Sequence, residues 1–191
     1  MIDLKVPSYP VARTPGDPDF QFKRPGAWEP GAMGNPLDQF PHLVAICISS
    51  GGIPKRPISS VRISTTGLES DGHHHEKHDR PSQAVCLQDI EKLDELQAEG
   101  YPLYCGTTGE NLTVGNLNVN ALPVGTILEF SGGLVIRLTK VRQPCYVLDA
   151  INPKLKEAII GRCGYYAEVV KEGILKAGET IHVVDLALFR G

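Results

Sequence analysis

The sequence lacks the features that would indicate nucleic acid, a membrane or secretion. Its 191 residues carry a net charge of −3, and no block of five or more like charges occurs that would attract a phosphate backbone. The longest apolar stretches, such as 43–48, are far too short to span a membrane. The first residues contain an early acid and prolines where a secretory signal has a basic region and an apolar run. We therefore expect a cytoplasmic protein that binds neither nucleic acid nor a membrane.

Cysteine is scarce, at five residues, and no two of them form a Cys-x-x-Cys pair. An odd number without such spacing argues against a disulfide framework and favours reduced thiols. Cys47 and Cys86 fall within apolar, strand-like runs and are predicted to lie in the core. Cys105 and Cys163 stand beside glycines, which leaves their roles open.

Proline is concentrated at the N-terminus, where residues 1–41 hold eight of the fifteen prolines. Such a segment cannot propagate a helix or a central strand. Its aromatic residues favour partial docking, because a solvated linker rarely carries several. We predict a proline-rich extension over 1–41, extended or partly docked, followed by a single domain over 42–191.

From Leu43 onward the sequence consists of short apolar or alternating runs separated by glycine-rich turns. The runs predict strands at 42–48, 61–64, 83–87, 127–130, 134–138, 165–170 and 180–184. Helices are predicted at 89–99, which Gly100 ends, and at 153–160, which Asn152 precedes as a good N-cap. Many short strands with two helices favour a mainly β fold, a barrel or a sandwich, over a βαβ fold.

A polar loop over 71–80 contains four histidines. Several imidazoles in one loop can converge on a divalent metal, and a zinc hydrolase is one interpretation of this pattern. No second ligand cluster at regular spacing accompanies the loop, so histidines that face water or bond locally are the alternative. Some of its groups are expected to line a pocket, as polar loops at barrel mouths do.

A glycine-containing loop follows at 105–114. Gly106 and Gly109 allow the backbone to approach a ligand closely and expose N–H groups to an anion. Thr108, Glu110 and Asn111 add side-chain donors and acceptors. No lysine follows the glycines, so the loop is not a P-loop, and an ordinary turn is the alternative.

Two further segments carry basic residues beside a cysteine. Cys145 follows a proline just past a predicted strand, and Lys140 and Arg142 nearby favour its thiolate, the form that binds a soft metal or carries a persulfide. Arg162 lies between glycines, after the second predicted helix. It either clamps a phosphate or carboxylate or caps that helix, and on its own the segment favours capping.

Taken in order, these segments resemble the MOSC domain, the family named after the C-terminal domain of molybdenum cofactor sulfurase. The matching stretches run from about Leu43 to Val184 and include 67–71 with the histidines after it, 84–87, 109–114, 122–126, 142–146 and 177–179. Each stretch alone is a weak signal. Their common order, with Gly-Glu-Asn-Leu-Thr-Val and the proline-cysteine strand end among them, is specific.

The resemblance implies a MOSC-type β-barrel with a few short helices and a pocket for the molybdenum cofactor, a molybdopterin. It implies that Cys145 carries sulfur as a persulfide or ligates molybdenum, as part of a sulfurtransferase or oxidoreductase activity. It also implies that Asn111 and Glu110 lie in the pocket, with Asp71, His73 and Arg142 beside them. The predicted cofactor-binding set is completed by Thr108, Arg80 and Arg162.

Departures from the family pattern affect the basic residues and the partner. Ser70 stands where the family often has glycine, and Gln83 where it often has arginine, although Arg80 lies three residues earlier. The sequence shows no aminotransferase-like domain that would release sulfur from cysteine, so we expect a separate sulfur donor. Reduction of N-hydroxylated compounds, the first alternative, would need an electron-transfer protein instead. A non-catalytic binding module is the second alternative, and the oligomeric state stays open, with a dimer among the options.

Overall fold

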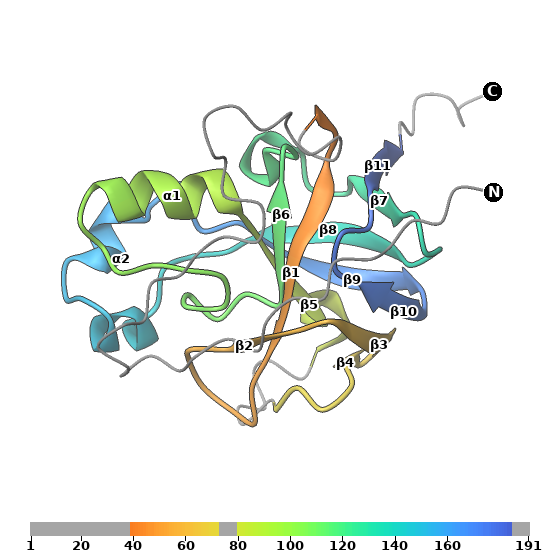
Figure 1. Ribbon diagram of the computed structural model, residues 1–191, viewed down its shortest axis with the longest axis horizontal. Helices are drawn as coiled ribbons and strands as arrows, with labels where there is room; N and C mark the ends of the chain where they lie inside the picture. The colour runs from red at the N-terminus through yellow and green to blue at the C-terminus, as the bar shows by residue number, and fades with distance from the viewer. Residues whose placement is uncertain (1–38, 73–79, 185–191) are drawn as a thin grey trace, which may run out of the picture. The chain divides into compact units, whose positions relative to one another are not determined.

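The computed structural model describes residues 39–72 and 80–184, and two sheets account for most of them. An eight-stranded sheet has the order β11-β7-β8-β9-β5-β6-β1-β2, and a three-stranded sheet has the order β10-β3-β4 (Figure 1). The strands are β1 (His42–Ile48), β2 (Arg56–Ile58), β3 (Ser60–Ser64), β4 (Gly67–Leu68), β5 (Val85–Asp89), β6 (Leu112–Gly115), β7 (Ile127–Phe130), β8 (Val135–Val141), β9 (Tyr165–Lys171), β10 (Gly173–Lys176) and β11 (Ile181–Val184). Among these strands only β5 and β6 pair in parallel.

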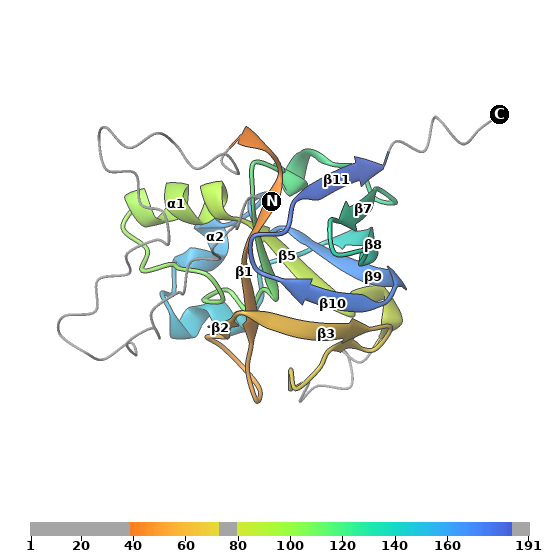
Figure 2. The same ribbon diagram turned by 45° about the vertical axis from the view of Figure 1, so that its right-hand side comes forward.

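Two α-helices and three 3-10 helices connect the strands within the described ranges. They are α1 (Ile90–Ala98), α2 (Leu155–Ala158), η3 (Pro81–Gln83), η4 (Val119–Ala121) and η5 (Tyr146–Ala150). Figures 1 and 2 show α1 and α2 next to each other, away from β7 and β11. Their buried leucines and isoleucines form a cluster of their own, separate from the main core. None of the described helices is long and apolar enough to cross a membrane.

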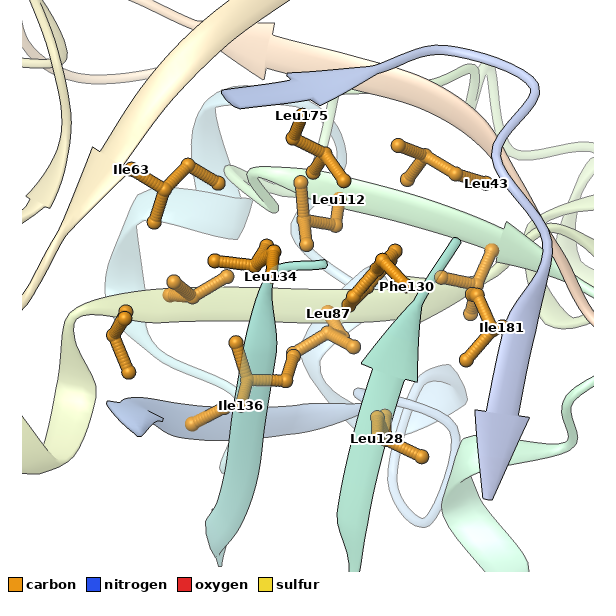
Figure 3. Packing of buried hydrophobic residues seen from close by; sticks show 14 of the residues in the cluster. Leu43, Ile63, Leu87, Leu112, Leu128, Phe130, Leu134, Ile136, Leu175 and Ile181 are labelled. Carbon is orange, nitrogen blue, oxygen red and sulfur yellow. The ribbon is translucent and has the colours of Figure 1, made fainter. Parts of the chain in front are cut away.

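The main core lies between the two sheets and follows from the alternation of apolar and polar residues. On β8 and the residue before it, Leu134, Ile136 and Leu138 are fully buried while Arg137 is exposed, as a period of two requires. Figure 3 shows side chains from both sheets pointing toward one another, with Ile63 and Leu175 contributed by the three-stranded sheet. One continuous cluster therefore joins the two sheets into one body.

The mainly β class is as predicted, but the sheets do not close into the predicted barrel. The N-terminal part of β1 meets the segment before β11 at a single bridge, His42 to Thr180, with Leu43 N–H donating to Glu179 O at 2.8 Å. The C-terminal part of β1 pairs with β2 instead. Because the outer edge of β1 is divided between two neighbours, no continuous ladder joins β11 to β1.

The predicted helices differ from the observed ones at their ends. Helix α1 matches the expected 89–99 to within a residue at each end. Helix α2 is shorter than the expected 153–160, because Asn152 Oδ1 accepts the Lys154 N–H at 2.9 Å and forms a turn before the helix begins. Gln83, expected in a strand, lies in η3, and the strand begins at Val85. Residues 1–38, most of the predicted extension, are outside the described residues, so the boundary at 41/42 stays a prediction.

Candidate functional site

Cys145 lies in an irregular segment between β8 and η5. Just past β8, Arg142 N–H donates to Gly164 O at 2.9 Å, and Leu148 N–H of η5 donates back to Cys145 O at 3.2 Å. Cys145 is exposed, whereas the other four cysteines are buried. Of the five thiols, Cys145 is therefore the one that a solvent-borne reagent or ligand can reach.

The half-buried Arg142 side chain is held in place beside this segment. Its Nη2 donates to Thr108 O at 2.8 Å and its Nη1 to Cys163 O at 3.3 Å, while the guanidinium carbon stands 5.8 Å from the Tyr166 ring centroid. Burial by itself would lower the pKa of Arg142, but Cys86 and Cys163 raise it, and the net direction is upward. Within the described part of the chain no carboxylate lies within ion-pair distance of Arg142, so its positive charge is not neutralised by a salt bridge.

Two buried thiols and a phenol surround the Arg142 guanidinium. Burial raises the pKa of Cys86 to about 11, and it also raises the pKa of Cys163, while the charge of Arg142 acts in the opposite direction on both. Burial likewise raises the pKa of Tyr166, so its phenol stays protonated at neutral pH. A charge on Cys145 raises the pKa values of Cys163 and Tyr166 further.

Glu110 organises the glycine-containing loop from a fully buried position. Its Oε1 accepts Gly106 N–H at 2.6 Å and Thr113 Oγ1 at 3.2 Å, and its Oε2 accepts Thr108 Oγ1 at 2.7 Å. Both carboxylate oxygens are thus engaged in holding the loop. Because the carbonyl of Thr108 accepts from Arg142, Glu110 acts on the site through the loop geometry.

The loop N–H groups are not the open anion nest that the sequence predicts. Gly106 N–H is bound to Glu110, Thr107 N–H donates to Tyr104 O at 3.0 Å, and Gly109 N–H donates to Gly106 O at 3.1 Å. Gly106 is nevertheless required, because its φ is +85° and an added Cβ would lie 2.4 Å from Lys55 O. Its role is a close approach to the backbone of the neighbouring loop.

Asn111 joins a buried ion pair that the sequence analysis missed. Asp71 Oδ2 accepts Asn111 Nδ2 at 2.8 Å and also the Lys55 ammonium, while Asp71 Oδ1 accepts Ser49 N–H at 3.0 Å. The Asp71 side chain is 0% exposed and that of Lys55 is 11% exposed. A buried carboxylate needs a compensating cation. The predicted site residue Asp71 was therefore the signal that could have led to Lys55.

The structure brings together some of the predicted site residues and separates others. Thr108, Glu110 and Arg142 are connected by hydrogen bonds, and Asn111 and Asp71 are connected to each other. Arg80 is exposed immediately before η3. His73 and the rest of the histidine loop, 73–79, lie outside the described residues. Among those described, no group of three or more histidine, cysteine or acidic side chains is arranged to hold a metal ion.

Arg162 is engaged elsewhere, between the two helices. Its Nη1 and Nη2 donate to the Glu99 carboxylate at 2.6 and 3.1 Å, and its Nε donates to Ala158 O at 3.2 Å. It therefore caps α2 and ties it to the end of α1. These are the contacts that the capping interpretation requires.

A depression of about 500 Å³ lies on other elements, lined by Ser131, Gly132, Ile174, Lys176 and Glu179. The Glu179 carboxylate there accepts Gly132 N–H at 2.7 Å and Lys176 N–H at 2.8 Å. The only carboxylate in the lining is thus bound to local backbone. None of the residues around Arg142 takes part in this depression.

Comparisons with known proteins identify solved structures of similar fold. YuaD from Bacillus subtilis is 16% identical with a TM-score of 0.64, over 75% of this chain and 95% of that one. YiiM from Geobacillus stearothermophilus is 25% identical with a TM-score of 0.63, over 76% and 75% of the two chains. YiiM from Escherichia coli is 20% identical with a TM-score of 0.60, over 75% and 70%. No curated protein sequence matches the chain significantly.

The family comparison covers the residues described above. The MOSC domain matches residues 71–182, more than half of the chain, and this range contains Asp71, Asn111, Arg142 and Cys145. The solved structures share the fold over about three quarters of this chain. The chain belongs to the MOSC domain family.

Proposed function

We propose that this chain binds the molybdenum cofactor beside Arg142 and uses Cys145 as a sulfur carrier or as a molybdenum ligand. The observation that carries the proposal is the contrast between one exposed thiol and four buried ones, with the exposed thiol three residues from a fixed guanidinium that has no ion-pair partner among the described residues. A soft thiolate suits molybdenum or sulfane sulfur. A half-buried cation held in place suits the phosphate of the pterin.

The residues present fit such a ligand in their chemistry. Arg142 offers N–H groups beyond the two bound to carbonyl oxygens, since a guanidinium has five. The Lys55 ammonium, which is 11% exposed, adds a second cation whose charge is balanced by Asp71. Among the residues that the structure describes, these groups therefore provide one cation without a carboxylate partner, one cation paired with Asp71, and an accessible sulfur atom.

Each protein group has a distinct part in the proposed chemistry. Arg142 holds the anionic end of the ligand, and its own bonds to Thr108 O and Cys163 O fix its position. Tyr166 remains a neutral O–H donor near Cys145 because burial raises its pKa. The Cys145 sulfur receives or supplies the transferred sulfur atom, or binds the metal. When bound, the cofactor would supply a redox-active metal that accepts a sulfur ligand.

A separate protein is the proposed partner for either role of Cys145. Sulfur carriage needs a donor that delivers sulfane sulfur to the exposed thiol. Metal-dependent reduction needs a protein that delivers electrons. The exposure of Cys145 supports both, because a partner's reactive group must approach this sulfur from solvent.

The test is molybdenum retention. Wild type, Cys145→Ser and the neighbouring control Tyr146→Phe are mixed with molybdenum cofactor and desalted, and the molybdenum-to-protein ratio is measured. Tyr146 is a suitable control because its side chain is 68% exposed beside the thiol. We expect retention by wild type and Tyr146→Phe and a several-fold loss in Cys145→Ser. Equal retention in all three proteins, or none in any, contradicts a role for the thiolate in holding the cofactor.

A further inference from the structure

Cys163 is a second thiol, and its segment is tied to the segments that lead into and out of Cys145. Before Cys145, Arg142 N–H is bound to Gly164 O and Arg142 Nη1 to Cys163 O, at 2.9 and 3.3 Å. After Cys145, Leu148 packs in the same buried cluster as Cys163. Each anchor is three residues from Cys145, a stretch that spans at most about 10 Å.

The surroundings of the two thiols differ. Cys163 is 3% exposed, while Cys145 is exposed and stands outside the sheet ladders. The positive charge of Arg142 opposes the effect of burial on Cys163 and favours its thiolate. A charge on Cys145 also raises the pKa of Cys163. The pair thus consists of one thiol open to solvent and one protected thiol next to a cation.

We propose that Cys163 is a resolving thiol that discharges a persulfide on Cys145. This inference rests on the proposed function, because it requires Cys145 to carry sulfane sulfur. The Cys163 sulfur attacks the Cys145 sulfur of the persulfide, a Cys145–Cys163 bond forms, and the bond to the outer sulfur breaks. The proton lost by Cys163 ends on the leaving sulfur, which departs as hydrosulfide.

The step balances without an external oxidant. The two cysteine sulfurs end as a disulfide, and the outer sulfur of the persulfide takes up the electron pair as it leaves. The two Cα atoms must come within about 4.4–6.8 Å of each other for the bond to form. The approach has to come from the segment that holds Cys145, which lies between β8 and η5, outside the strand ladders. A thiol reductant then regenerates both cysteines.

The burial of Cys163 determines which of the two thiols receives sulfur first. Its low exposure keeps it from reacting with a sulfur donor in solution, so Cys145 is loaded first. Because burial raises the pKa of Cys163, the discharge is slow at neutral pH and accelerates as the pH rises. The persulfide therefore persists long enough for its sulfur to be transferred to a partner protein. If no partner accepts the sulfur, Cys163 discharges the persulfide.

The experiment follows both steps on the full chain without oxygen. The reduced protein is incubated with inorganic polysulfide, desalted and followed by mass spectrometry of peptides and by hydrosulfide release. Wild type, Cys163→Ser, Cys163→Ala and Cys105→Ser are compared. Cys105 is the matched control because it is also buried beside a glycine but packs in another cluster, with Cys47.

We expect wild type and Cys105→Ser to gain one sulfur atom on Cys145, release hydrosulfide and form a Cys145–Cys163 disulfide. The Cys163 variants should keep the persulfide and release hydrosulfide at least several-fold more slowly. A persulfide on Cys145 that decays at the same rate in all variants, or a disulfide to another cysteine, overturns this inference alone. If no persulfide forms on wild-type Cys145, sulfur carriage fails as well, and the wild-type measurement decides this whether or not the Cys163 variants fold.

Discussion

Replacing Asp71 with asparagine removes the counterion of the Lys55 ammonium and leaves that charge in a nearly dry site. The Asp71 side chain is 0% exposed and accepts from Ser49 N–H and Asn111 Nδ2 as well as from Lys55. An asparagine at this position has one acceptor oxygen where the carboxylate has two. Lys55→Met creates the complementary defect, a buried carboxylate without its cation.

The expected magnitude follows from the burial of the pair. Removing one partner of a buried ion pair costs about 3–5 kcal/mol, and the 11% exposure of Lys55 places these variants near 3 kcal/mol. The double variant, Asp71→Asn with Lys55→Met, removes both charges and should be less unstable than the sum of the single variants. We expect a coupling free energy of about 2 kcal/mol.

Urea denaturation of the four proteins measures this coupling, with unchanged m-values as the sign that the unfolding reaction is the same. The matched control is the surface pair of Lys156 and Asp149, whose charged atoms are 2.9 Å apart and whose side chains are 41% and 42% exposed. Its coupling should stay below about 0.5 kcal/mol because water screens it. If the Lys55–Asp71 coupling is no larger than that of the control pair, the reasoning from burial is wrong.

Three further predictions concern thiols, a glycine and an arginine. In the native protein at neutral pH, iodoacetamide should label Cys145 alone. Burial raises the pKa of Cys86 to about 11, so labelling of Cys86 should appear only as the pH approaches that value and the thiolate forms. Rapid labelling of Cys86 at neutral pH would contradict its burial. Gly164→Ala should lower the free energy of unfolding, measured by urea denaturation, by more than about 3 kcal/mol, because the added Cβ would lie 1.9 Å from Leu87 O. Gly161→Ala should lower it by only about 1–2 kcal/mol, because Gly161 has open space around it and only its φ of +76° is unfavourable. Similar losses in the two variants would refute the close approach at Gly164. Arg162→Ala should lower stability slightly and leave molybdenum retention unchanged, because this side chain binds Glu99 and Ala158 O; a loss of retention would assign Arg162 to the cofactor instead.

Elements with strong local patterns could be predicted from the sequence. Strand β1 has the expected bounds, and the β7 and β8 hairpin follows from its alternation and the glycines between the strands. Strand β10 was not predicted, because it is short and begins with Gly173, and glycine weakens a strand pattern. Strand β2 contains Pro57, which weakens a strand pattern. The barrel prediction was wrong because closure depends on how distant edges pair, and local periodicity carries no information on that pairing.

The candidate site could be predicted only as far as residue types indicate chemistry. Cys145, Arg142, Thr108 and Glu110 were identified from their motifs, and the hydrogen bonds that connect three of them arise from segments far apart in the sequence. The Gly106 N–H is bound because the Glu110 carboxylate lies beside it, a position that the sequence alone does not give. Lys55 was missed because a lysine in a glycine- and proline-rich loop has the pattern of a solvated residue.

Protection of Cys145 by the cofactor tests the central claim most directly. The rate of iodoacetamide labelling at Cys145 is measured with and without saturating molybdenum cofactor, in wild type and in Arg142→Met. If the cofactor binds beside Arg142 and covers the thiol, labelling of wild type slows at least several-fold and the variant shows no protection at the same concentration. A cofactor that binds while Cys145 reacts at an unchanged rate would contradict the account.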